Sequence, residues 1–71
     1  MLTADEIKAL CAVSGLDTME REVTVGNPPE FSWRVSIQGI RTPRIFAVGY
    51  AETLPEAYND AWEAYVDRYR D

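Results

Sequence analysis

The chain has 71 residues, of which 46% are hydrophobic and 27% are charged, and its formal net charge at pH 7 is −5. This length and composition are typical of one folded domain and exclude a wholly disordered chain, while no apolar run approaches the roughly 20 residues of a membrane-spanning helix. The acidic balance also argues against a general electrostatic attraction to nucleic acid, which requires a basic surface.

The chain begins with a predicted helix over residues 4–14. Thr3 and Glu6 have the spacing of a capping box, in which each side chain accepts a hydrogen bond from the backbone N–H of the other residue. Gly15 suits the left-handed conformation that commonly follows the end of a helix. The residues between follow at helical spacing: Ile7, Leu10, Cys11 and Ser14.

Three strands are predicted next, over residues 20–25, 31–38 and 44–50. A loop over residues 26–30 separates the first two, because its two prolines do not fit the interior of a sheet. The second strand alternates apolar and polar residues, which indicates one buried face and one hydrated face, as in an antiparallel sheet. Its apolar face holds Phe31, Trp33, Val35 and Ile37, and its polar face holds Ser32, Arg34, Ser36 and Gln38.

A second helix is predicted from the capping box of Thr53 and Glu56 to about Tyr69, with Pro55 in its first turn. The order of elements is then α-β-β-β-α, which defines an α+β fold. Its simplest architecture is a three-stranded antiparallel sheet with both helices packed on one face.

This order resembles the double-stranded-RNA-binding domain (dsRBD), and the resemblance covers nearly the whole chain. Gly15 and Leu16 are similar to the end of that family's first helix, and residues 26–29 are similar to its first hairpin loop, after which Phe31 begins a strand. The second helix begins with further matching positions: Gly49, Thr53, Ala57 and Ala61. The resemblance implies one dsRBD-like domain over residues 1–71.

The RNA-contacting residues of that family are mostly absent. The family has lysines at the start of its second helix, where this chain has Leu54, Pro55 and Glu56. The family's first hairpin loop usually carries a histidine, and here Glu30 stands near that place. Glu6 on the first helix could contact a ribose hydroxyl, but capping explains it equally well. These departures argue against binding of duplex RNA.

The second helix has more apolar surface than one packing face requires, because its apolar arc spans about 200°. Its alanines predict close packing on the sheet: Ala57, Ala61 and Ala64. Leu54 and Tyr65 lie near the boundary of that face. The remaining residues form a candidate protein-binding stripe: Tyr58, Trp62, Val66 and Tyr69. The alternative is that the first helix covers this stripe, or that its Tyr and Trp rings lie flat on the surface with their polar tips hydrated.

A second candidate surface is the face of the sheet away from the helices, where Arg34 lies. A secondary basic surface is predicted from four arginines of the middle segment: Arg21, Arg34, Arg41 and Arg44. Two interpretations remain open for it. The arginines form ion pairs with Glu20 and Glu22, or they dock an acidic partner or a nucleic-acid backbone.

The chemical groups of the chain argue against catalysis. There is no histidine, which removes the commonest general base and the commonest metal ligand, and Cys11 is the one cysteine. Cys11 is interpreted as a small core residue, with a reactive thiol as the alternative. We therefore expect no enzymatic activity, cofactor, metal ion or small-molecule substrate.

The leading interpretation is a non-catalytic interaction module that binds a protein, or a second copy of itself as a homodimer, through the aromatic side of the second helix. One alternative is a nucleic-acid-binding protein that uses the sheet arginines. Another is a small accessory protein of a phage or mobile element that inhibits a host complex, which size and charge suit. The acidic start of the chain, unlike a basic signal peptide, predicts a cytoplasmic protein with no membrane partner.

Overall fold

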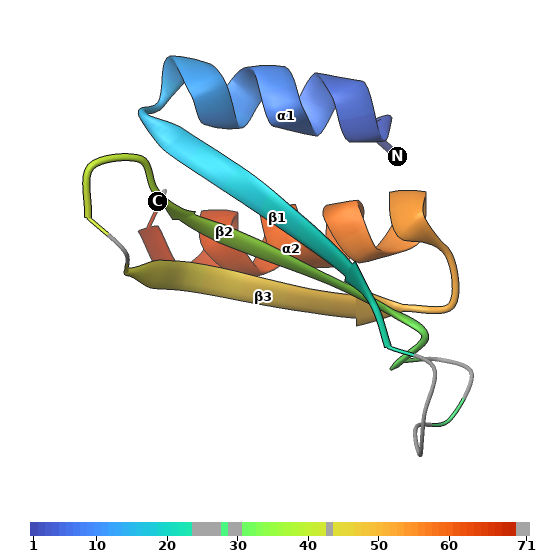
Figure 1. Cartoon of the computed structure of the whole chain (residues 1–71). Helices are drawn as coiled ribbons and strands as arrows, with labels where there is room; N and C mark the ends of the chain where they lie inside the picture. Colours follow the sequence, from blue (N-terminus) through green and yellow to red (C-terminus); the bar gives the residue numbers. More distant parts are fainter. Residues whose placement is uncertain (24–27, 29–30, 43, 70–71) are drawn as a thin grey trace.

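The computed structural model describes residues 1–23, 28, 31–42 and 44–69. Its elements are α1 (Ala4–Val13), β1 (Leu16–Glu22), β2 (Trp33–Gly39), β3 (Ile45–Ala51) and α2 (Leu54–Tyr69). The strands form one antiparallel sheet in the order β1-β2-β3. Both helices contact the sheet, with α1 beside β1 and α2 behind β2 and β3 (Figure 1). The predicted α+β fold and its α-β-β-β-α order are confirmed.

Local sequence signals explain both ends of α1. The Thr3 backbone N–H donates to Glu6 Oε1 at 2.8 Å and the Glu6 backbone N–H donates to Thr3 Oγ1 at 3.1 Å, so the predicted capping box is present. Gly15 ends the helix with φ of +74°, a conformation that residues with a Cβ rarely adopt. Leu2, the residue before the N-cap of α1, is fixed by the side chain of Asn59 in α2. This side chain accepts a hydrogen bond from the Leu2 N–H and donates one to the Leu2 C=O.

Strand β1 starts at Leu16, four residues earlier than the sequence predicts. Leu16 pairs with Gly39 and is buried, whereas Thr18 and Glu20, which share its face, are polar. A strand whose inward face carries polar residues shows no apolar alternation, which explains the missed start. The predicted loop over residues 26–30 and the end of the first predicted strand lie mostly outside the described residues.

The core lies between the helices and one face of the sheet. Gly49 lets α2 approach β3 closely, because a Cβ built there would lie 2.2 Å from the Ala61 nitrogen and 2.5 Å from the Ala57 oxygen. Ala57 and Ala61 are fully buried as predicted, but Ala64 is exposed, since the helix turns it away from the sheet. The buried apolar residues form one cluster: Ile7, Cys11, Leu16, Val35, Ile37, Ala47, Ala57, Tyr58, Ala61 and Trp62.

Aspartates lie against both edge strands of the sheet. On β1 the Thr18 N–H donates to Asp17 Oδ1 at 2.9 Å, and on β3 the Tyr50 N–H donates to Asp60 Oδ2 at 3.0 Å. Each edge therefore has one backbone donor occupied by a carboxylate of the same chain.

Neither helix in the described ranges is long and apolar enough to cross a bilayer.

Candidate functional site

The structure buries the first residue of the predicted binding stripe. Tyr58 is 1% exposed, and its hydroxyl donates to Glu20 Oε2 at 2.5 Å. Lys8 of α1 lies 5.5 Å from the centre of the Tyr58 ring and 3.9 Å from Glu20 Oε2. Burial, reinforced by the hydrogen bond to Glu20, raises the pKa of Tyr58 to about 12. Tyr58 is therefore a core residue covered from α1, as the alternative interpretation has it.

The other three residues of the stripe differ in exposure. Trp62 is 8% exposed and belongs to the core cluster, so only its rim reaches the surface. Val66 is half-buried, and Tyr69 is 42% exposed. The four predicted residues are thus not brought together as one exposed stripe, and the accessible part lies in the second half of α2. The binding role of this part stays a prediction.

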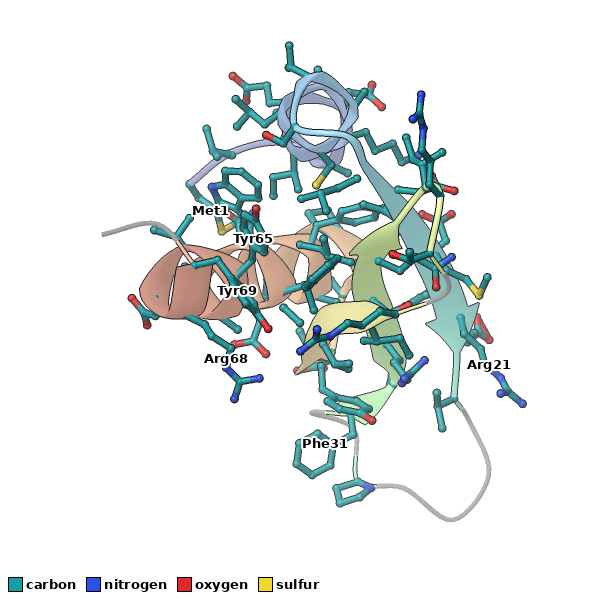
Figure 2. The ribbon with its side chains drawn as sticks, turned by 90° about the vertical axis from the view of Figure 1, so that its left-hand side faces the viewer. Met1, Arg21, Phe31, Tyr65, Arg68 and Tyr69 are labelled. Atoms are coloured by element: carbon teal, nitrogen blue, oxygen red, sulfur yellow. The ribbon has the colours of Figure 1, made fainter. Side chains whose placement is uncertain are left out.

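Aromatic rings in the second half of α2 form a continuous series, here called the aromatic ladder: Trp62, Tyr65, Tyr69 and Phe46. Trp62 and Tyr65 stack with centroids 5.5 Å apart, and Tyr65 and Tyr69 follow at 5.4 Å. Phe46 of β3 meets Tyr69 edge-on, also at 5.4 Å. Figure 2 shows Tyr65 and Tyr69 together along α2. Because each ring is held by its neighbour, the ladder is a pre-ordered apolar surface.

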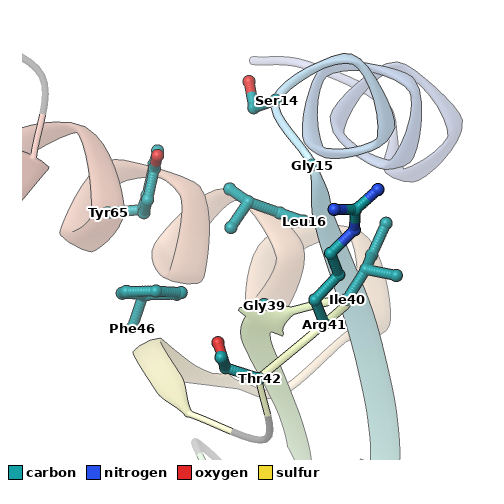
Figure 3. A pocket seen from close by; sticks show the side chains of 9 residues that line it. All are labelled: Ser14, Gly15, Leu16, Gly39, Ile40, Arg41, Thr42, Phe46 and Tyr65. Carbon is teal, nitrogen blue, oxygen red and sulfur yellow. The ribbon is translucent and has the colours of Figure 1, made fainter.

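A groove of about 600 Å³ lies beside the ladder, where α1 ends and β2 turns into β3 (Figure 3). Tyr65 and Phe46 stand on one side of this groove, and Ile40 and Arg41 stand on the other. Its floor is apolar at Leu16, which is buried. The full lining is Ser14, Gly15, Leu16, Gly39, Ile40, Arg41, Thr42, Phe46 and Tyr65. The groove can receive an apolar side chain from a partner.

A second hollow, of about 350 Å³, lies along α2 and is lined by Trp62, Glu63, Val66 and Asp67. Tyr65 lines the first groove and Trp62 lines this hollow, while the two rings stack on each other. The stacked pair therefore separates two depressions. Concave sites beside rigid aromatic rings are where interface anchors are typically found.

Sequence reasoning missed Phe46 as a surface residue next to α2. Ile37 pairs with Ala47 while Gln38 pairs with Ile45, so the extra residue in β3 forms a bulge at Phe46. Strict alternation from the inward-facing Ala47 would turn Phe46 away from the helices. The bulge brings it to Tyr69 instead, and no residue type in this strand signals the irregularity.

The four predicted arginines do not form one basic surface. Arg21 and Arg34 are directly opposite each other on the face of the sheet away from the helices. Arg41 lines the groove, and Arg44 lies 5.6 Å from the centre of the Phe46 ring. Ion pairs with Glu20 do not neutralise the sheet arginines, because Glu20 faces the helices and contacts Tyr58 and Lys8.

The groups that could carry out chemistry are dispersed. Cys11 is 1% exposed, and burial raises the pKa of its thiol, with the charge of Asp17 adding to the shift. This placement fits a small core residue. Across residues 1–23, 28, 31–42 and 44–69, no three acidic or cysteine side chains gather as a metal site would require.

No protein-family model matches the chain, and the searches of curated proteins and of solved structures gave no match.

Proposed function

We propose that this protein is a non-catalytic interaction module that binds a protein partner, or a second copy of itself, through the aromatic ladder and the groove beside it. The observation that carries the proposal is the stacking of Tyr65 between two depressions, next to the half-exposed Tyr69. Ordered aromatic rings provide large apolar contact at a small loss of conformational entropy, which is why they dominate protein interfaces.

The fold supports the same proposal. The α-β-β-β-α order and the antiparallel sheet are compatible with a dsRBD-like scaffold. At the start of α2, where that family contacts phosphates, the Thr53 hydroxyl instead donates to Glu56 Oε1 at 2.6 Å, and Leu54 packs against the core. The Thr53–Glu56 hydrogen bond joins two side chains and is not the predicted capping box. Because these side chains and the core occupy this end of α2, we assign binding to the other end and to a protein rather than to duplex RNA.

Light scattering over a range of protein concentrations measures molar mass and so tests whether the protein forms a homodimer through the aromatic ladder. We expect a dimer for the wild type and a monomer for Tyr69→Ala, because this substitution removes an exposed ring of the ladder. Tyr50→Ala is the matched control, since Tyr50 and Tyr69 are each 42% exposed but Tyr50 lies on the other face of the sheet. Trp62→Ala is less suitable because Trp62 also belongs to the core.

A wild type that is monomeric at every concentration would contradict self-association. Binding of a different protein through this surface is tested by photo-crosslinking in the source cell. The photo-crosslinking residue benzoylphenylalanine is placed at position 69 or at position 50. We expect position 69 to give a crosslinked product that position 50 does not give. No product at position 69, or the same product from both positions, would contradict the proposed surface.

A further inference from the structure

A row of three side chains crosses the open face of the sheet, the face that neither helix covers. Arg21 of β1 is directly opposite Arg34 of β2, which is directly opposite Tyr50 of β3. Directly opposed residues point to the same side of a sheet. Figure 2 shows Arg21 on the side away from α2 and far from Tyr65 and Tyr69.

The two arginines of this row place like charges directly opposite each other. Within the described part of the chain, neither guanidinium has an acidic group within 4.0 Å. Asp17, the acid of β1 on this face, lies two rows away, and its carboxylate accepts the Thr18 N–H. Like charges directly opposite in a sheet destabilise it. The fold therefore retains an unfavourable pair that an incoming anion would relieve.

Exposed apolar groups surround this pair. Phe31 was predicted on the buried face of the second strand, but it precedes β2 and is exposed. Its ring meets the Tyr50 ring edge-on at 5.7 Å, and each of these residues is more than 40% exposed. The next row holds Met19, which is 55% exposed, and Val48, on either side of the buried Ser36. Aromatic residues, methionine and arginine are the types enriched in protein interfaces, whereas lysine and glutamate are depleted there.

We propose that the open face is a second binding site, and that its occupant is an acidic peptide segment of a partner protein. Carboxylates of the segment pair with Arg21 and Arg34, because the guanidinium fork matches a carboxylate in two parallel hydrogen bonds. Apolar side chains of the same segment lie on Met19 and Tyr50. This site is separate from the aromatic ladder and does not depend on the function proposed for it.

A single-stranded nucleic acid is the competing occupant, since it also combines anions with surfaces that stack on aromatic rings. The charges favour the peptide. A nucleic-acid strand has a phosphate at every nucleotide and needs a basic groove along its path, whereas this face offers two arginines on a chain of net charge −5. A peptide needs only two carboxylates at one place.

Selection from a displayed library of random peptides, with the immobilised full chain as target, tests the proposal. We expect enrichment of peptides that combine Asp or Glu with apolar residues. One enriched peptide, made with a fluorescent label, should bind at least tenfold more weakly to the double variant Arg21→Gln and Arg34→Gln. It should bind within about twofold of wild type to Lys8→Gln with Arg68→Gln, which changes the net charge equally but away from this face and from the groove.

The melting temperature of the free protein distinguishes a binding role of Arg21 and Arg34 from a role in stabilising the fold. Removing the opposed pair should leave it unchanged or raise it, while binding is lost. Enrichment of neutral or basic peptides, no enrichment, or equal loss in both double variants would overturn the proposal. So would a labelled ten-nucleotide oligothymidylate that binds this face more tightly than the selected peptide.

Discussion

The two halves of α2 have similar sequences and different surroundings. Residues 54–61 carry Ala57, Tyr58 and Ala61, all of which are buried. Residues 62–69 carry Trp62, Tyr65 and Tyr69, of which only Trp62 is buried. Both halves combine aromatic residues, alanines and acids, yet the tyrosine of the first half is buried whereas Tyr65 and Tyr69 of the second half reach the surface. Helical spacing alone therefore does not decide which tyrosines a partner can reach.

The length of α1 accounts for much of this difference. With 10 residues against the 16 of α2, α1 is about 15 Å long and α2 about 24 Å, at 1.5 Å per residue. Asn59 hydrogen-bonds Leu2, so the start of α1 is fixed beside the first half of α2. Lys8 reaches Tyr58 from α1, whereas Tyr65 borders the groove that opens where α1 ends.

The largest expected difference between the halves is in the free energy of unfolding when one tyrosine in each half is replaced by alanine. Tyr58→Ala removes a buried ring and leaves a cavity, so we expect it to lower the free energy of unfolding by about 3–5 kcal/mol. Tyr69→Ala, the matched variant in the exposed half, should lower it by less than about 1 kcal/mol. Urea unfolding followed by circular dichroism measures both values. Equal losses would show that the halves are not distinct.

Gly49→Ala should affect both halves of α2, because it forces the helix away from β3. The added Cβ would lie 2.8 Å from the Ala61 Cα as well as against the backbone atoms already described, and a helix backbone cannot rotate aside as a side chain can. We expect a loss of about 1–3 kcal/mol or more, typical of overpacking. The same unfolding experiment gives the value.

Gly15→Ala is the control for that substitution. A Cβ at Gly15 meets no atom within 4 Å, so only its positive φ opposes alanine. We expect about 1–2 kcal/mol from this backbone conformation. If Gly49→Ala is no more destabilising than a surface substitution, the inference that α2 approaches β3 too closely for a Cβ at this position is wrong.

Asn59→Ala should weaken the connection that places α1 over the first half of α2. It removes the hydrogen bonds to Leu2, at 3.1 and 2.7 Å, and one to the Pro55 oxygen at 2.9 Å. We expect about 1–2 kcal/mol of destabilisation. Hydrogen exchange should show faster exchange in α1 than in the wild type. Glu63→Ala, on the exposed side of the same helix, should leave α1 unchanged.

The last expected effect is a pH dependence that originates in Tyr58, in the buried half. The pKa of Tyr58 is about 12 in the folded protein and near its ordinary value of 10 in the unfolded chain. Between these values the unfolded chain loses the proton first, so the free energy of unfolding should decrease as the pH rises from about 10 to about 12. Urea midpoints measured across this window should fall less steeply for Tyr58→Phe than for Tyr69→Phe. Equal slopes would contradict the assignment.

Much of the fold could be predicted because it depends on local signals. Thr3 with Glu6 and the positive φ of Gly15 fix α1 through contacts within a few residues, and the alternation of β2 fixes its buried face. The start of β1 could not be predicted, because Glu20 faces inward to meet Tyr58, a residue 38 positions later in the chain.

The candidate site was predicted only in part, since exposure depends on contacts between elements. The sequence places Tyr58 and Tyr69 on the same side of a helix, but only the position of α1 determines which of them is covered. Phe46 joins the ladder through a bulge that depends on how β3 pairs with Gln38. The opposed arginines could not be foreseen either, because strand register decides that Arg21 meets Arg34.

The aspartates at the two edges of the sheet restrict how other chains can attach. A strand that added to β1 or β3 would have to displace Asp17 from the Thr18 N–H or Asp60 from the Tyr50 N–H before it could complete a ladder. Growth of the sheet from molecule to molecule, the route to fibrous aggregates, is opposed at both edges. Binding through the surfaces proposed above would then rest on side chains, so that recognition would depend on the partner's sequence rather than on an extended backbone that any chain can adopt.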